Sequence, residues 1–252
     1  MTYNPFSLQG KTILVTGASS GIGRAIAVEC SKMGACVIIT GRNEKNLTET
    51  FNLLEKSEGR EHGMILADLA KTEHLTKVIS EIPPLDGLVN NAGIGNTCLI
   101  KFIQEEELGK VLHINLMVPV LLTQRLYKNK KLNKNASVVF VSSIAGLCQV
   151  TPGNAIYSAS KSAVNAFMQH AALEFSQRGI RCNTVNPGTV NTPFLNKEMI
   201  SAADRERDRA RYPLKRYGEP VDVALGVIYL LSDASEWVTG SHLVIDGGCS
   251  LV

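Results

Sequence analysis

A tyrosine and a lysine lie four residues apart in the run Tyr157-Ser158-Ala159-Ser160-Lys161. If this run is helical, the spacing places both side chains on one face of the helix, one turn apart. A free phenol has a pKa of about 10, and a neighbouring ammonium lowers that pKa by stabilising the phenolate. The pair could therefore supply an acid for ketone reduction or a base for alcohol oxidation. The spacing by itself is a weak signal, because a helical tyrosine often has a lysine four residues later by chance.

Two polar positions upstream could take part in the same chemistry. An apolar run ends in Val141-Ser142-Ser143, and Ser143 could hold a carbonyl oxygen by hydrogen bonding as negative charge develops on it. Ser142 competes for that role, and a serine after a strand also commonly caps a turn. Asn115 is polar within a largely apolar helical run, so it is either a satisfied buried amide or a group that orders water leading from Lys161 to solvent.

A glycine-rich turn, with the sequence TGASSGIG at residues 16–23, separates the first apolar run from a helical segment. Glycines allow a tight turn and let a pyrophosphate approach the backbone N–H groups of a helix N-terminus, where the helix dipole favours negative charge. The spacing is G-x-x-x-G-x-G rather than the commoner G-x-G-x-x-G. Its place between the first strand and the first helix favours a nucleotide site over an ordinary glycine turn.

The end of the second expected strand decides which dinucleotide fits. An acidic residue there would bind the ribose hydroxyls of the adenosine and repel a 2′-phosphate. The sequence has Thr40-Gly41-Arg42-Asn43 instead, and Arg42 could form a charge-assisted hydrogen bond to a 2′-phosphate. We therefore expect NADP(H) to be preferred over NAD(H), the alternative being that Arg42 points to solvent.

Alternating strands and helices must position these residues. Short runs rich in valine and isoleucine alternate with longer segments of helical period, which is typical of parallel strands joined by right-handed helical crossovers. We expect strands at Thr12–Thr16, Cys36–Thr40, Gly63–Ala67, Gly87–Asn90, Ser137–Ser142, Arg181–Asn186 and His242–Asp246. We expect helices at about Gly21–Met33, Glu44–Lys56, Thr72–Glu81, Gln104–Tyr127, Ala155–Arg178 and Pro220–Ser232. Most strands lack in/out alternation, which predicts a single α/β domain with helices on both faces of the sheet, a three-layer αβα sandwich.

The composition argues against several classes of protein. The 252 residues are 44% hydrophobic, enough to bury a large core. The 26 Lys+Arg and 23 Asp+Glu leave a net charge of only +3, which argues against a nucleic-acid partner. No apolar run reaches the roughly 18 residues of a membrane span, and the first residues lack the pattern of a signal peptide. We therefore expect a cytoplasmic protein with no membrane partner.

The cysteines and a charged segment carry no clear chemical signal. The six cysteines are far apart in sequence and lack a C-x-x-C or His–Cys spacing that could hold zinc: Cys30, Cys36, Cys98, Cys148, Cys182 and Cys249. We interpret them as reduced thiols and expect no metal site. The segment Asn191–Tyr217 has no expected strand and contains a mixed-charge run at residues 204–209, for which a solvated helix face is favoured over an anion site.

Taken in order, these motifs resemble the short-chain dehydrogenase/reductase family. The resemblance spans essentially the whole chain and is carried by Gly17, Gly21, Gly23, Asp68, Asn90, Asn91, Ala92, Gly93, Asn115, Ser143, Tyr157, Lys161, Asn186, Pro187 and Gly188. It implies a single-domain Rossmann fold over residues 1–252, with a seven-stranded parallel sheet of order 3-2-1-4-5-6-7. It also implies a substrate lid, which we place at about residues 191–217.

The resemblance further implies roles for individual residues. Tyr157 would be the acid/base, Lys161 would lower its pKa and bind the nicotinamide ribose, and Ser143 would orient the carbonyl. Asn115 would sustain a proton relay, and the nicotinamide would supply the hydride. Together with Arg42, the expected cofactor-binding residues are Gly17, Ser19, Ser20, Gly21, Ile22, Gly23, Asp68, Leu69, Asn91, Ala92, Gly93, Tyr157, Lys161, Pro187, Gly188, Val190 and Thr192.

The resemblance predicts an oxidoreductase that transfers hydride between NADP(H) and a carbonyl or secondary alcohol. The pattern looks most like 3-oxoacyl-acyl-carrier-protein reductases, which act on acyl thioesters. The alternatives are a polyol, gluconate or steroid-type alcohol dehydrogenase and, from another class, a non-catalytic nucleotide-binding regulator. The presence of both Tyr157 and Lys161 argues against the regulator.

Two features bear on the substrate and on assembly. Ser143 lies fourteen residues before Tyr157, where many family members have thirteen, so we expect one extra residue in the substrate loop around residues 147–152. Family members are usually homotetramers, joined partly through the helix that carries the tyrosine. The apolar stripe Ala163, Phe167 and Ala171 on this helix could face either a partner subunit or the core.

Overall fold

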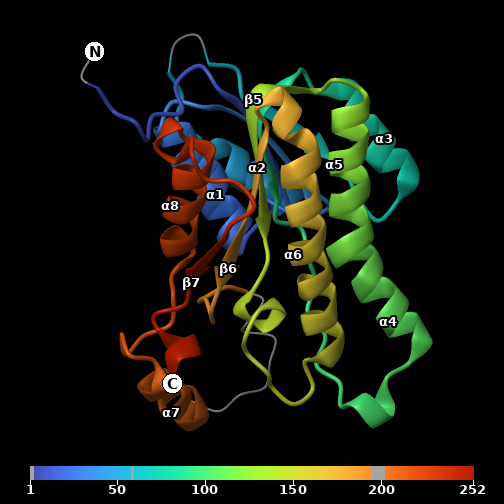
Figure 1. Ribbon diagram of the computed structural model, residues 1–252, viewed down its shortest axis with the longest axis vertical. Coiled ribbons are helices and arrows are strands. Elements are labelled where there is room, and N and C mark those ends of the chain that lie inside the picture. The colour runs from blue at the N-terminus through green and yellow to red at the C-terminus, as the bar shows by residue number, and fades with distance from the viewer. Residues whose placement is uncertain (1–2, 58–59, 194–201) are drawn as a thin grey trace.

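The computed structural model describes residues 3–57, 60–193 and 202–252, and a parallel sheet forms its middle layer (Figure 1). The strands are β1 (Thr12–Thr16), β2 (Cys36–Gly41), β3 (Gly63–Leu66), β4 (Leu85–Asn90), β5 (Leu132–Val141), β6 (Arg181–Pro187) and β7 (His242–Ile245). Their order in the sheet is β3-β2-β1-β4-β5-β6-β7, with every neighbouring pair parallel. The predicted fold class, strand number and strand order are confirmed.

Helices cover both faces of the sheet (Figure 1). They are α1 (Gly21–Lys32), α2 (Glu44–Asn52), α3 (Thr72–Glu81), α4 (Glu105–Leu112), α5 (Val118–Lys128), α6 (Ala155–Phe175), α7 (Ala202–Arg211) and α8 (Pro220–Leu231). One buried cluster joins α1, α2 and α8 to one face of the sheet, and a second joins α3, α5 and α6 to the other. In β1, Ile13, Leu14 and Val15 are all completely buried, which explains why the strand lacks in/out alternation.

One expected helix is interrupted. Instead of a continuous helix over 104–127, the chain forms α4, a π-helical turn at His113–Met117 and then α5. In this turn the Val118 N–H bonds the His113 carbonyl, five residues back. Pro119 explains the interruption, because it has no N–H to donate to the carbonyl of Asn115 and its ring crowds that carbonyl. The expected single helix was therefore wrong at the position of Asn115.

Two other boundaries differ from the expected ones by more than three residues. Strand β5 begins at Leu132, five residues before the expected Ser137, because Leu132 is buried and pairs with Leu85 ahead of a register shift in β4. The polar residues between Leu132 and Ser137 hid this extension from the sequence pattern. Helix α2 ends at Asn52 rather than Lys56.

The segment expected to carry the lid lies partly outside the described residues, because residues 194–201 are not among them. After this gap, α7 contains the mixed-charge run, and Arg209 forms an ion pair with Glu206 on its solvent-exposed side. The expected solvated helix is thus confirmed for the described part. A parallel bridge between Val190 and Gly218 joins the residues that flank the segment 191–217.

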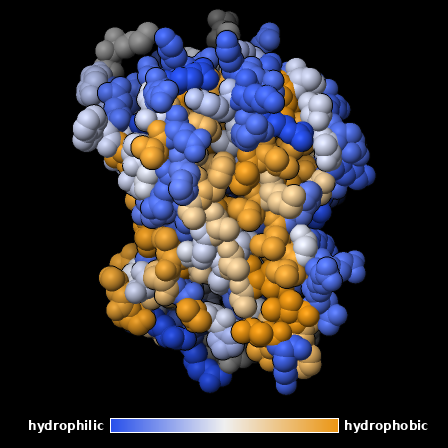
Figure 2. Space-filling model, turned by 45° about the vertical axis from the view of Figure 1, so that its right-hand side comes forward, coloured by the Kyte–Doolittle hydropathy of each residue, from blue (hydrophilic) through white to orange (hydrophobic). Residues whose placement is uncertain are grey.

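The apolar stripe on α6 faces the core. Ala171 is buried, and Phe167 packs edge to face on Phe140 of β5 with ring centroids 5.9 Å apart. Other apolar side chains remain on the surface, and Figure 2 shows them gathered mainly on the lower half of the molecule. Leu173 on the outer side of α6 is 75% exposed. Among the described helices, none is both long enough and apolar enough to span a membrane.

Candidate active site

The glycine-rich turn is fastened to the loop after β4 through Thr16. The Thr16 hydroxyl donates to the Val89 carbonyl at 3.2 Å and accepts from the backbone N–H groups of Asn91 (3.0 Å) and Ala92 (3.1 Å). In return, the Asn91 amide donates to the carbonyls of Thr16 (2.9 Å) and Gly17 (3.1 Å). These bonds bring the two predicted cofactor segments together, although they use the Asn91 side chain to hold the turn.

Two glycines in this turn are required by close contact. Gly17 has a φ of +65°, and a Cβ added there would lie 2.8 Å from the Cα of Ala92. A Cβ at Gly23 would lie 2.3 Å from the Gly17 carbonyl oxygen and 2.4 Å from the Asn91 amide nitrogen. Any larger residue would push the turn away from the loop after β4.

The residues present fit a dinucleotide phosphate at the start of α1. Ser20 is the N-cap residue, but its side chain makes no capping bond, so no side chain caps the first N–H groups of the helix. A Cβ at Gly21 would lie 3.2 Å from the Thr192 side chain, which places Thr192 directly beside this helix terminus. The backbone of Gly21, Ile22 and Gly23 can therefore receive a pyrophosphate.

The adenosine end of the expected site lies at the ends of β2 and β3. Arg42 directly follows β2 and is exposed, and Ser19 lies 3.3 Å from the Cβ position of Gly41. Asp68 and Leu69 follow β3, and the Asp68 carboxylate accepts from the Ala70 N–H at 3.2 Å. Ser19 and Arg42 are therefore neighbours at the end of β2.

The Asn115 side chain lies in the π-helical turn, and both of its polar atoms have hydrogen-bond partners. Its oxygen accepts from the Ile94 N–H at 2.8 Å, and its nitrogen donates to the Ile94 carbonyl (2.9 Å) and to the Ser160 hydroxyl (3.1 Å). Ser160 in turn donates to the Tyr157 carbonyl at 2.7 Å. Asn115 therefore links the loop after β4 to the helix that carries Tyr157.

Lys161 is a buried ammonium that ends beside Tyr157. Its Nζ donates to the Val141 carbonyl at 2.9 Å and lies 5.7 Å from the centre of the Tyr157 ring. A Cβ at Gly93 would lie only 3.6 Å from this Nζ. Burial lowers the pKa of Lys161 to about 8, so the group is charged at neutral pH.

Tyr157 and Ser143 are hydrogen-bonded to each other. Burial raises the pKa of Tyr157 to about 12, and a hydrogen bond from the Ser143 side chain acts in the opposite direction. The Ser143 oxygen also accepts from the Ala145 N–H at 3.2 Å, so Ser143 caps this turn as well as contacting Tyr157. Tyr157 is therefore a protonated phenol at neutral pH, ready to act as an acid.

Ser142, the competitor for the carbonyl-binding role, points elsewhere. It is buried, and its hydroxyl donates to the Lys161 carbonyl at 3.3 Å. Ser142 directly follows β5, whereas Ser143 is the N-cap residue of the short helical turn Ile144–Gly146. Of the two serines, Ser143 is the one whose side chain reaches Tyr157.

Sequence reasoning did not single out Ser160 or Arg24. Ser160 connects Asn115 to the Tyr157 backbone, whereas the Arg24 guanidinium donates to the Ser19 carbonyl (2.8 Å) and the Thr50 hydroxyl (2.9 Å), fastening the glycine-rich turn to α2. Because Arg24 directly follows Gly23, the sequence shows that it lies beside the glycine-rich turn. The sequence does not show its partner Thr50 on α2, which is 26 residues away.

The residues that follow β6, which are expected to border the nicotinamide, lie beside the end of β7 and the glycine-rich turn. Pro187 ends β6, and a Cβ at Gly188 would lie 3.0 Å from the Cα of Asp246, so Gly188 is held close to the end of β7. Val190 is buried, and the Thr192 hydroxyl donates to its carbonyl at 3.3 Å. The structure brings this strand end beside the glycine-rich turn through the contact between Thr192 and Gly21.

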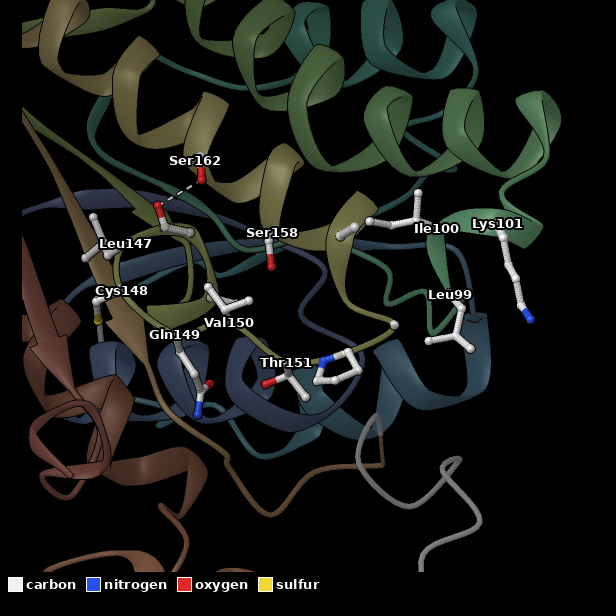
Figure 3. A pocket seen from close by; sticks show the side chains of 15 residues that line it. Leu99, Ile100, Lys101, Leu147, Cys148, Gln149, Val150, Thr151, Ser158 and Ser162 are labelled. Atoms are coloured by element: carbon white, nitrogen blue, oxygen red, sulfur yellow. Dashed lines mark hydrogen bonds between the residues drawn. The ribbon is translucent and has the colours of Figure 1, made fainter.

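An apolar cavity of about 770 Å³ lies next to the loop between Ser143 and Tyr157 (Figure 3). Its walls come from three segments: the loop after β5, the short turn at 99–101 and the first turns of α6. Its lining includes Leu99, Ile100, Leu147, Val150, Pro152 and Lys101. Ser143 and Tyr157 are not among the residues that line this cavity, so the cavity lies beside these two side chains.

Comparisons with known proteins agree with this arrangement. Residues 17–250 match a family model described as enoyl-(acyl carrier protein) reductase. The chain is 37% identical over 245 residues to the 3-oxoacyl-[acyl-carrier-protein] reductase FabG of Rickettsia felis, covering 97% of this chain and 99% of that protein. It is 37% identical to the reductase of the same name from Thermotoga maritima, covering 96% and 98% of the two chains. A crystal structure provisionally described as an NAD(P)-dependent gluconate 5-dehydrogenase from Beutenbergia cavernae, with bound NADP, superposes with a TM-score of 0.88 at 31% identity, covering 99% of this chain and all of that one.

Proposed function

Because the chain belongs to the short-chain dehydrogenase/reductase family and is thus an NAD(P)-dependent oxidoreductase, we propose that it reduces a 3-oxoacyl thioester to the 3-hydroxyacyl thioester with NADPH. The observation that carries the chemistry is the contact of Ser143 with the protonated Tyr157, beside the buried Lys161 ammonium. The names of the curated relatives and the apolar cavity support the substrate class.

Tyr157 and Ser143 act on the substrate oxygen. When bound, the reduced nicotinamide supplies the hydride to the carbonyl carbon. Ser143 donates a hydrogen bond to the carbonyl oxygen, and Tyr157 transfers its proton to that oxygen as the C–O bond becomes single. The tyrosine is left as a phenolate and must then regain a proton.

Lys161 and Asn115 support Tyr157. The ammonium, 5.7 Å from the ring centre, stabilises the phenolate left after proton transfer. Asn115 holds the Ile94 backbone and, through Ser160, the first turn of α6, so it fixes the position of Tyr157 relative to the loop after β4. In this proposal the Asn115 side chain positions Tyr157, and the expected role of Asn115 in a proton relay is kept.

The residues around the expected cofactor favour NADPH. Arg42 is an exposed cation directly after β2, where an acidic residue would have opposed a 2′-phosphate. Ser19 adds a hydroxyl beside the Gly41 position. The backbone of Gly21 to Gly23 would hold the pyrophosphate.

The cavity beside the loop Ile144–Asn154 favours an apolar substrate tail over a polyol. Most of its lining surface is apolar, although Gln149, Thr151, Ser158 and Ser162 also line it, and Lys101 is the charged side chain among the described lining residues. A sugar acid would instead require hydrogen-bonding partners for several hydroxyls, because buried polar groups without partners cost free energy. The similarity to the gluconate 5-dehydrogenase structure makes a sugar-acid dehydrogenase the second candidate.

Steady-state oxidation of NADPH with an acetoacetyl thioester, followed by the absorbance of the reduced nicotinamide, tests the proposal. We expect turnover by the wild type, at least about a thousandfold loss in Tyr157→Phe because general acid catalysis contributes roughly that much, and normal rates in the control Tyr127→Phe. Tyr127 stacks on Phe175 and lies outside the proposed site. Turnover with 5-ketogluconate and none with the thioester would instead establish the second candidate, and unchanged activity in Tyr157→Phe would refute the catalytic assignment.

A further inference from the structure

Tyr212 connects segments that no motif had linked. It follows α7 directly and is only 2% exposed. Its hydroxyl donates to the Thr189 hydroxyl at 2.6 Å and accepts from the Thr189 backbone N–H at 3.3 Å. One phenol thus satisfies both the side chain and the backbone of a residue 23 positions earlier in the chain.

Thr189 lies in the strand end that is expected to border the nicotinamide. Its neighbours are Gly188, whose N–H bonds the Ile245 carbonyl at 3.0 Å, and Val190, which is buried. The Thr189 carbonyl accepts from the Gly218 N–H at 2.9 Å. The Thr189 N–H, by contrast, depends on the Tyr212 hydroxyl, so the phenol fixes the orientation of the peptide between Gly188 and Thr189.

The C-terminal turn holds Tyr212 itself in place. A Cβ at Gly247 would lie 3.5 Å from the Tyr212 ring, and the Leu214 N–H bonds the Gly247 carbonyl at 3.2 Å. The neighbouring Pro213 lies 2.8 Å from the Cβ position of Gly248. The phenol is therefore held by the end of the chain as well as by α7.

We propose that Tyr212 is a positioning residue for the nicotinamide half of the cofactor, acting through Thr189. This inference rests on the proposed placement of the nicotinamide against Pro187, Gly188 and Val190. With the phenol present, the strand end is fixed before the cofactor binds, so binding does not have to order it. Without the hydroxyl, the Thr189 N–H loses its partner, and the peptide can turn toward another one.

The chain contains a matched control for this phenol. Tyr217 packs edge to face on Tyr212 with ring centroids 5.5 Å apart, is similarly buried, and donates its hydroxyl to Asp208 on α7 at 2.8 Å. Tyr217→Phe therefore removes a hydroxyl bond within the same substructure and leaves the bonds to Thr189 in place. A general loosening of this region would affect both variants.

The experiment compares the binding of NADPH with that of adenosine 2′,5′-bisphosphate, which lacks the nicotinamide half, by isothermal titration calorimetry. We expect Tyr212→Phe to weaken NADPH by about threefold to tenfold, the equivalent of one net hydrogen bond, and to leave the bisphosphate unchanged. Tyr217→Phe should bind both ligands like the wild type. Thr189→Val removes the side-chain acceptor but keeps the backbone N–H, so it should weaken NADPH less than Tyr212→Phe does, and the Tyr212→Phe/Thr189→Val double variant should lose no more than Tyr212→Phe alone.

Equal weakening of both ligands by Tyr212→Phe, or equal effects of Tyr212→Phe and Tyr217→Phe, would overturn the proposal, because either result indicates a general structural role. The underlying placement of the nicotinamide fails in a different way. If the wild type bound NADPH no more tightly than the bisphosphate, the nicotinamide half would make no favourable contact, and the proposed site itself would be wrong. In another outcome, the wild type binds NADPH more tightly than the bisphosphate, and Tyr212→Phe keeps the whole of this difference in affinity. That result would refute the role of Tyr212 and leave the placement of the nicotinamide intact.

Discussion

At the scale of single residues, burial gives Tyr157 and Lys161 opposite shifts of pKa. Loss of solvation disfavours the charged form of each group, so it raises the pKa of the phenol to about 12 and lowers that of the ammonium to about 8. At neutral pH the phenol is protonated and the ammonium is charged, which suits a reductase. Lys161 is the group whose charge changes first as the pH rises.

The first prediction concerns the pH dependence of reduction. We expect kcat/KM to be level below about pH 8 and to fall above it, because Lys161 loses the charge that stabilises the phenolate. In Lys161→Arg the falling limb should move to higher pH, since a guanidinium stays protonated there. The measurement is a pH profile of initial rates, with Lys77→Arg as the surface control. A limb that stays near pH 8 in Lys161→Arg would show that another group controls it.

The second prediction concerns the choice of cofactor. Arg42→Ala should weaken NADPH by about tenfold, the equivalent of one charge-assisted hydrogen bond, and should change NADH by much less. A fluorescence titration with each reduced nucleotide measures both affinities. The control is Lys77→Ala, which removes an exposed cation paired with Glu81 on α3. Equal losses for NADPH and NADH would mean that Arg42 does not contact the 2′-phosphate.

At the scale of elements, the glycine-rich turn works because two backbones approach each other without side chains between them. Gly17 combines a φ of +65° with a Cβ position 2.8 Å from Ala92. Gly109, in the middle of α4, has no atom within 4 Å of its Cβ position. An added methyl group would therefore clash at Gly17 and meet no neighbouring atom at Gly109.

The third prediction compares these two glycines. Gly17→Ala should lower the free energy of unfolding by about 1 to 3 kcal/mol, because of backbone strain and the clash with Ala92, and should weaken nucleotide binding. Gly109→Ala should raise the free energy of unfolding by up to about 1 kcal/mol through helix propensity, with unchanged binding. Urea unfolding measures both changes. A Gly17→Ala protein as stable as the wild type would contradict the contact between the turn and Ala92.

At the scale of the whole molecule, the edge strand β7 and the outer side of α6 are among the features that the three layers leave uncovered. Strand β7 is at one edge of the sheet, and its Val244 is 40% exposed. Leu173 projects from the outer side of α6 with 75% of its surface exposed. Open strand edges and exposed apolar side chains are commonly covered by association. We propose on this basis that the chain forms a homotetramer, as family members usually do.

The fourth prediction tests this assembly. Leu173→Glu should shift sedimentation toward smaller species, because it would place a charge in an apolar contact. Leu53→Glu is the control, since Leu53 is also exposed but lies beyond the end of α2, on the opposite face of the sheet. A wild-type chain that sediments as a monomer would refute the tetramer, and a tetramer unaffected by Leu173→Glu would place its interface elsewhere.

The sequence by itself determined the parallel sheet, the glycine-rich turn at the start of α1 and the spacing of Tyr157 and Lys161. These features depend on short-range periodicity and on residues within a few positions of one another, where backbone geometry leaves few alternatives. Arg42 and Ser143 could be predicted for the same reason, since each lies within two residues of a strand end.

Only the tertiary structure determined the protonation states of these residues and the hydrogen bonds that hold them in place. The pKa of Tyr157 follows from burial, the amide of Asn115 bonds Ile94 and Ser160 on another helix, and Pro119 opens a π-helical turn in a segment of otherwise regular helical period. The bond from Tyr212 to Thr189 depends on how the chain returns to β6 after 23 residues. No local pattern encodes such a partner, because packing of distant segments determines which polar groups meet.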